Sequence, residues 1–63
     1  MRAAPEAIFR QVDEEQVVFW VSVDGRSYRA WGMFRGRHID ARERSRSASV
    51  EGWLRKANFA ADR

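Results

Sequence analysis

The sequence contains no cysteine, a single proline and a single lysine among its 63 residues. Without cysteine the chain can form neither disulfides nor thiolate metal sites, so its stability must come from a compact aromatic core or from self-association. The longest apolar run, residues 17–21, is far shorter than the roughly 20 residues that a membrane-spanning helix needs. The N-terminus also lacks the features of a signal peptide. We therefore expect a soluble, cytoplasmic protein without a membrane partner.

Positive charge is distributed unevenly along the chain, although the net charge is only +3. Residues 1–25 hold two arginines against five acidic residues, a balance of −3. Residues 26–46 hold seven arginines against two acidic residues, a balance of +5. Such a concentration of positive charge favours a polyanionic partner. A competing explanation is codon bias in a GC-rich genome, which also favours arginine over lysine.

Two Gly-containing turns organise the middle of the chain. Residues 17–23 are rich in β-branched and aromatic side chains, which is typical of a strand. Asp24 and Gly25 then form the dipeptide that a two-residue type I′ hairpin turn favours, and Arg35 with Gly36 provides a second turn. The sequence therefore predicts three antiparallel strands joined by two hairpins.

The turns also predict which residues face each other and which face of the sheet is buried. The first turn places Phe19 opposite Ala30, and the second places Gly32 opposite Ile39. The two registers are independent, yet both gather apolar residues on one side of the sheet. This predicted inner face consists of Val17, Phe19, Val21, Val23, Tyr28, Ala30, Gly32, Phe34, Ile39 and Ala41.

A helix over residues 47–60 is expected to cover the inner face. Residues 45–49 offer serine hydroxyls that can cap its first N–H groups. Gly52 inside the helix costs roughly 1 kcal/mol relative to Ala, so we expect it to permit a close approach to the sheet. The apolar residues at helical spacing are Val50, Trp53, Leu54 and Ala57.

Residues 5–12, "PEAIFRQV", are compatible with two structures. Pro5 and Glu6 suit a first helical turn, whereas Ile8 and Val12 would both face inward from a strand. We favour a short helix and keep an extra strand as the alternative. The predicted fold is α+β, a three-stranded antiparallel β-meander with a C-terminal helix packed on one face (β-β-β-α). Residues 1–15 form a partly ordered N-terminal segment, and residues 16–63 form a single domain.

The opposite, outer face of the predicted sheet carries two tryptophans flanked by arginines. Arginine pairs with phosphate and with guanine, and an aromatic ring accepts a stacked base. The pattern therefore predicts a nucleic-acid-binding surface, with DNA favoured over RNA. Its residues would be Trp20, Arg29, Trp31, Arg35, Arg42 and Arg44.

Two other interpretations of this face stay open. Val18, Trp20, Trp31 and Met33 could form an apolar patch for a protein partner or for a second copy of the chain. Alternatively, the stems of neighbouring arginines could cover Trp20 through cation–π contacts, so that the face needs no ligand.

The order of three strands and a helix, with "RSRSASVEGWLRKAN" leading into that helix, resembles the Arm-type DNA-binding domain of tyrosine recombinases. It is also similar in outline to the plant ethylene-response-factor domain. Both resemblances imply that the sheet lies in the major groove and that the six residues named above contact DNA. If residues 5–12 form a helix, the order of helix, three strands and helix would instead resemble the double-stranded RNA-binding domain.

No catalytic constellation is expected from this sequence. His38 and Asp40 lie two apart on one strand face, but they have no nucleophile or further ligand nearby. The serines at residues 45–49 are better explained as helix caps. We therefore expect a small non-enzymatic nucleic-acid-binding module with no cofactor and no metal, or else a protein-interaction or homodimerisation module that uses the same face.

Overall fold

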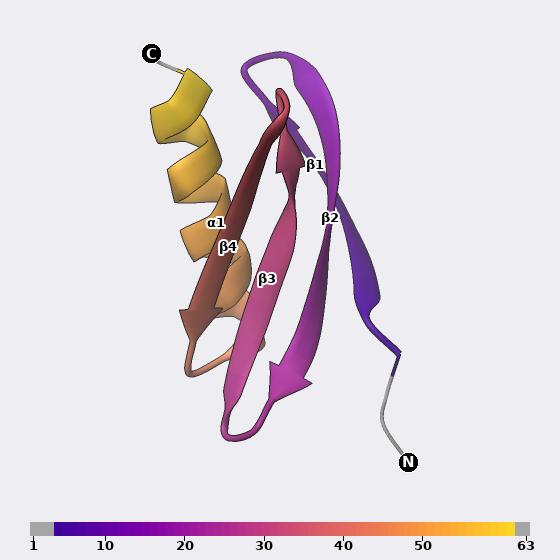
Figure 1. The fold of residues 1–63 in the computed structure, drawn as a ribbon, viewed down its shortest axis with the longest axis vertical. Coiled ribbons are helices and arrows are strands. Elements are labelled where there is room, and N and C mark those ends of the chain that lie inside the picture. The colour runs from indigo at the N-terminus through magenta and orange to yellow at the C-terminus, as the bar shows by residue number, and fades with distance from the viewer. Residues whose placement is uncertain (1–3, 62–63) are drawn as a thin grey trace.

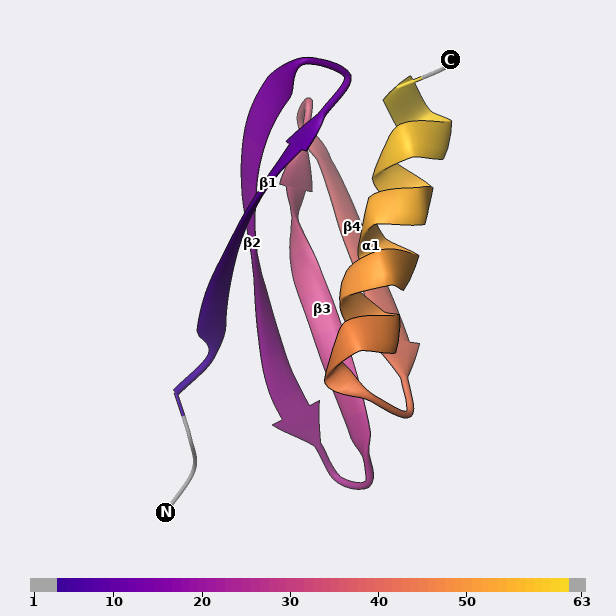
Figure 2. The same cartoon turned by 180° about the vertical axis from the view of Figure 1, so that it is seen from behind.

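Each strand of the protein pairs with the next strand in the sequence, and one helix covers one face of the resulting sheet (Figure 1, Figure 2). The computed structural model describes residues 4–61. The sheet is antiparallel, with strand order β1-β2-β3-β4. Its elements are β1 (Glu6–Val12), β2 (Glu15–Asp24), β3 (Ser27–Phe34), β4 (Arg37–Glu43) and α1 (Arg46–Ala61).

The prediction of a three-stranded meander was wrong, because the sheet has a fourth strand, β1, at its N-terminal edge. The helix that we favoured for residues 5–12 was wrong for the same reason. A tight loop made of Asp13 and Glu14, both with positive φ (52° and 65°), turns the chain directly back into β2. Ile8 and Val12 then alternate with exposed neighbours and are buried in the core.

The loop between β2 and β3 also differs from the predicted one. Asp24 pairs with Ser27, so the loop consists of Gly25 and Arg26 rather than of Asp24 and Gly25. Gly25 has a φ of 65°, and Arg26 is not among the residues with positive φ. A positive φ at the first loop position only is typical of a type II′ turn, which requires glycine there.

The pairing of β2 with β3 is consequently shifted by two residues. Val21, rather than Phe19, lies opposite Ala30, and Trp20 lies opposite Trp31. Side chains alternate between faces with a period of two, so this shift leaves every side chain on its predicted face. The register of β3 and β4 was predicted correctly: Gly32 lies opposite Ile39 across a loop in which both residues have positive φ.

The predicted inner face forms most of the core. Val23 is an exception, since 61% of its surface is exposed, and Tyr28 is only partly buried. Both lie near the β2–β3 loop, which extends beyond the first turn of α1 (Figure 2). The sheet residues that are buried in the core, including two from β1, are Ile8, Val12, Val17, Phe19, Val21, Ala30, Phe34, Ile39 and Ala41.

The helix begins where the serine-rich segment predicts. The backbone N–H of Ala48 donates to Ser45 Oγ at 3.1 Å, so Ser45 caps the helix. The helix packs chiefly on β3 and β4, and it buries Val50, Trp53 and Ala57. Within the described residues, no helix is both long and apolar enough to cross a membrane.

Gly52 brings α1 close to β4, as expected. A Cβ atom at this position would lie 3.3 Å from the Cβ of Ala41, which is a tight contact. At the next residue, the ring of Trp53 stacks on Phe19, and its indole Nε1–H donates to the carbonyl oxygen of Ile39 at 2.9 Å. The helix is therefore fixed on the sheet by close packing and by a buried hydrogen bond.

Candidate functional site

The outer face of the sheet is not covered by α1, and its centre is apolar. Trp20 and Trp31 lie opposite each other on β2 and β3, and Phe9 lies opposite Val18 on the neighbouring row. Phe9 and Met33 are more than half exposed (61% and 55%), and Trp20 is 38% exposed. We call these five residues, Phe9, Val18, Trp20, Trp31 and Met33, the outer apolar patch.

Charged side chains beside this patch are paired with charges of the opposite sign. Arg29 Nη2 lies 3.1 Å from Asp40 Oδ2, and the Arg29 guanidinium carbon lies 5.6 Å from the centre of the Trp31 ring. Arg42 Nε lies 3.4 Å from Asp24 Oδ2. Arg29 and Arg42 are direct cross-strand neighbours. Because each of these two cations has its own acidic partner, this part of the outer face is locally neutral.

Arg35 has a structural role at one end of the molecule. Its guanidinium contacts Glu15 Oε1 at 3.0 Å and Asp13 Oδ2 at 3.1 Å, and it lies 4.9 Å from the centre of the Phe34 ring. The hydrogen bonds to Glu15 and then to Asp13 raise the pKa of Arg35. Arg35 therefore joins the β3–β4 loop to the β1–β2 hairpin.

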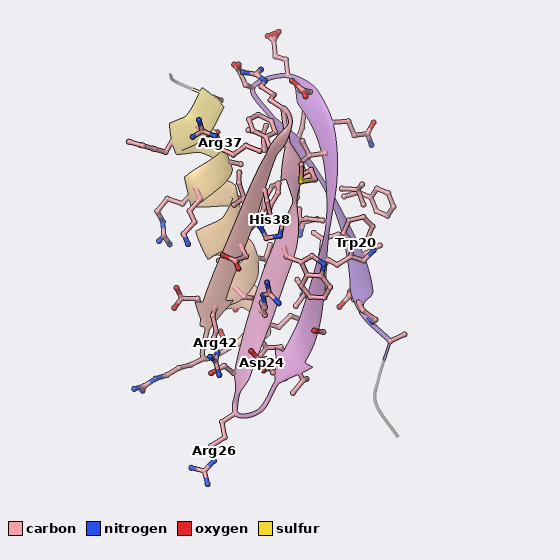
Figure 3. All side chains as sticks on the ribbon, viewed as in Figure 1. Trp20, Asp24, Arg26, Arg37, His38 and Arg42 are labelled. Carbon is pink, nitrogen blue, oxygen red and sulfur yellow. The ribbon has the colours of Figure 1, made fainter. Side chains whose placement is uncertain are left out.

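The structure brings together four of the six residues predicted to bind nucleic acid: Trp20, Arg29, Trp31 and Arg42 occupy two adjacent rows of the outer face. Arg35 and Arg44 flank β4 at its opposite ends. Figure 3 shows Trp20 and His38 near the middle of the sheet, with Asp24 and Arg42 nearer its lower end. In the alternative that arginines cover a tryptophan of this face, the contact formed is that of Arg29 with Trp31.

Sequence reasoning missed one member of the outer apolar patch, Phe9. It lies on β1, the segment for which we had favoured a helix. The signal was present, because a strand that turns Ile8 and Val12 inward must turn Phe9 outward.

A hollow of about 850 Å³ lies on the other face of the sheet, beside the start of α1. Val21, Val23 and Tyr28 line it together with the ion pair of Glu6 and Arg46. The Arg46 guanidinium holds the Glu6 carboxylate through two contacts, of 2.6 Å and 2.7 Å. The hydrogen bond lowers the pKa of Glu6 and raises the pKa of Arg46. This pair connects the start of β1 to the start of α1.

Comparison of the chain with protein-family models, with curated proteins and with solved structures found no match. The resemblance to the recombinase Arm-type domain therefore stays a prediction.

Proposed function

We propose that this chain is a small non-enzymatic protein-interaction module that binds a partner protein on its outer apolar patch. The observation that carries the proposal is the cross-strand pair of Trp20 and Trp31, with exposed Phe9 and Met33 beside it on the uncovered face of the sheet. Aromatic side chains and methionine are enriched at the centres of protein interfaces, where a few such residues supply most of the binding energy.

The charges around the patch favour a protein over a nucleic acid. Three of the four arginines predicted to contact nucleic acid, Arg29, Arg35 and Arg42, already contact acidic side chains. Binding to a phosphate backbone depends on the release of counterions by uncompensated positive charge. A polar rim of mixed sign around an apolar centre is instead the usual anatomy of a protein interface.

Nucleic acid is the second candidate, and one observation favours it. Arg29 and Arg42 lie directly opposite each other, in the row next to the pair of Trp20 and Trp31. Exposed ion pairs such as those with Asp40 and Asp24 are typically worth only about 0–1 kcal/mol. A phosphate could therefore replace the acidic partners while a base stacks on Trp20.

The test compares the wild-type protein with the double variant Trp20→Ser, Trp31→Ser. Each is immobilised and exposed to nuclease-treated lysate of the source cells at low and high salt. Any protein retained is then purified and titrated directly into the wild type and the double variant, with isothermal titration calorimetry as the readout. Arg55→Ser is the matched control, because Arg55 is exposed on α1, away from the outer face. In parallel, duplex DNA, single-stranded DNA and RNA are titrated at several salt concentrations.

The proposal predicts a partner that is retained at high salt, binds in the direct titration and is lost in the double variant but not in Arg55→Ser. Apolar burial is not screened by salt, so retention should change little as salt rises. Equal capture by the wild type and the double variant would contradict the proposal. Nucleic-acid binding that weakens with a log–log salt slope of about −0.9 per phosphate, and that is lost in Arg29→Ala with Arg42→Ala, would establish the second candidate instead.

A further inference from the structure

The two edges of the sheet differ in how their backbone groups are covered. At β4, α1 packs more closely than on any other strand, and Lys56 Nζ donates to the backbone carbonyl oxygen of Asp40 at 2.7 Å. At β1, the sheet ends without a neighbouring strand among the described residues. An uncovered edge strand offers a template for pairing with another strand. Because α1 packs least on β1 and most on β4, β1 is the edge more available for such pairing.

The register of the β1–β2 hairpin determines which backbone groups of β1 point away from the sheet. Val12 and Glu15 close a two-residue loop, and a pair in that position exchanges both backbone hydrogen bonds. Counting back by twos, the even-numbered residues of β1 bond to β2, whereas Ala7, Phe9 and Gln11 point their N–H and C=O groups outward. One observed bond agrees, since Arg10 Nη1 donates to the carbonyl oxygen of Phe9 at 2.8 Å.

The side chains of β1 are arranged so that the strand complements itself. Glu6 and Arg10 lie on the same face, two residues before and two residues after Ile8. We propose that β1 pairs with β1 of a second copy of this chain, antiparallel, with Ile8 opposite Ile8 of the second copy. Glu6 of each copy then faces Arg10 of the other, and opposite charges in directly opposed positions stabilise antiparallel pairs.

The outward backbone groups fit the same register. Ala7 of each copy lies opposite Phe9 of the other, so their outward N–H and C=O groups bond to each other. The hydrogen bond from Arg10 to the Phe9 carbonyl oxygen is then replaced by one from the N–H of Ala7 in the second copy. The pairing ends where Gln11 meets Pro5, which has no N–H to donate.

Two other registers also place the odd-numbered residues of the two β1 strands opposite each other. They are centred on Phe9 or on Ala7, and both are less favourable. Centring the pair on Phe9 would place Arg10 opposite Ile8 and Glu6 opposite Val12, so neither charge would meet an opposite charge in the second copy. Centring it on Ala7 would place Phe9 opposite Pro5, so the Phe9 carbonyl would lose its donor. The bidentate contact of Glu6 with Arg46 does not prevent the proposed pairing, because an ionised carboxylate can accept about four hydrogen bonds.

This dimer would be a single symmetric sheet, closed by a two-fold axis. The outer apolar patches of the two copies would adjoin at their Phe9 side chains and form one larger surface. Only this last consequence rests on the proposed function, because the pairing itself depends on the edge of β1.

The pairing is tested by sedimentation equilibrium over a range of concentrations with paired charge variants. Arg10→Glu places Glu opposite Glu6, and Glu6→Lys places Lys opposite Arg10. Each should weaken self-association at least about tenfold, since every dimer contains two such pairs and both change from attraction to repulsion. Mixed together, the two variants should associate as a heterodimer, because their opposed charges are complementary again. Arg55→Glu makes the same change of charge on α1 and should leave association unchanged.

Amide hydrogen exchange supplies a second readout that does not depend on a variant. The amides of Ala7 and Phe9 should become protected only at concentrations where the dimer forms, whereas the amide of Ile8 should be protected at all concentrations. A strict monomer at millimolar concentration would overturn the proposal, as would a dimer that is insensitive to Arg10→Glu or a variant mixture that fails to associate. The Trp20→Ser, Trp31→Ser variant separates the two proposals, because it should lose the partner protein and still self-associate.

Discussion

Phe19 and Trp53 stack face to face in the core, with ring centres 4.0 Å apart and planes inclined by only 8°. Both side chains are completely buried. Phe19 comes from β2 and Trp53 from α1, so this contact joins the sheet to the helix. The strand beside Phe19 must leave room for it, and Gly32 on β3 does so.

Gly32→Ala should destabilise the protein strongly. A Cβ atom at residue 32 would lie 2.6 Å from the Cβ of Phe19 and 3.0 Å from its Cα, so backbone would have to move. Overpacking of this kind typically costs about 1–3 kcal/mol. Urea denaturation gives the free energy of unfolding. Met33→Ala changes the next residue, which faces outward, and serves as the control. If Gly32→Ala were as stable as that control, the strands would not approach as closely as described.

The stacked pair also predicts an order of stability among helix variants. Trp53→Ala should cost about 3–5 kcal/mol, as is usual for a large buried aromatic residue. Leu54→Ala should cost less, because Leu54 is only partly buried although the sequence pattern placed it in the core. Urea denaturation of both variants tests this order, and a larger loss at Leu54 would contradict the observed orientation of α1.

Glu14→Gly should stabilise the protein. Glu14 adopts a φ of 65°, a left-handed conformation that typically costs a non-glycine residue about 1–2 kcal/mol. Glycine removes that cost, although part of the gain is offset by its greater freedom in the unfolded chain. Thermal and urea unfolding should show a gain of roughly 0.5–1 kcal/mol. The complementary change, Gly36→Ala at a φ of 78°, should lower stability in the same assay. The turn assignment fails if both changes act in the same direction.

The ion pair of Glu6 and Arg46 should make stability depend on pH in the acidic range. The hydrogen bond from Arg46 holds the pKa of Glu6 below its ordinary value of 4.5. Between the folded and unfolded pKa values, the unfolded chain binds more protons, so the free energy of unfolding rises with pH. The contribution is therefore complete above pH 4.5 and is lost as pH falls through the lower, folded pKa.

Glu6→Gln should remove this part of the pH dependence, as measured by urea denaturation at a series of pH values between about 3 and 6. Glu51→Gln on α1 is a control, because Glu51 is an exposed carboxylate away from the pair of Glu6 and Arg46. An unchanged pH profile in Glu6→Gln would show that the pair does not form in solution.

Much of the fold could be predicted from the alternation of side chains. The assignment of residues such as Phe19, Ala30 and Ile39 to the inner face survived even where the register was wrong, because the error was two residues and the pleat repeats every two. The β3–β4 register was correct, since Arg35 and Gly36 form the loop that the sequence indicates.

Turn chemistry limited the rest of the fold prediction. The β1–β2 loop contains no glycine. Its two residues, Asp13 and Glu14, have positive φ, which is uncommon for residues other than glycine, so the sequence carried no recognisable signal of a hairpin turn. In the β2–β3 loop, Gly25 occupies the first position rather than the second. Both errors concern the type of turn, which depends on how the flanking strands pair.

The outer face was predictable in composition but not in electrostatics. Alternation places Trp20, Trp31 and Arg29 on one side, as the structure shows. The acidic partners of the arginines lie on other strands, however, and their identity depends on the pairing of β2 with β3 and of β3 with β4. The +5 balance of residues 26–46 therefore overstated the positive charge of this surface, because acids such as Asp24 come from outside that segment.

The meander topology also determines the order in which the chain can fold. Every strand pairs only with its neighbour in the sequence, so each hairpin closes a short loop and can form early. The inner face of the sheet gains its cover last, when α1 docks and the ion pair of Glu6 with Arg46 closes across 40 positions of the chain. Until Trp53 has been added, Phe19 has no ring to stack on. The final quarter of the chain thus decides whether hairpins that form rapidly become a stable protein.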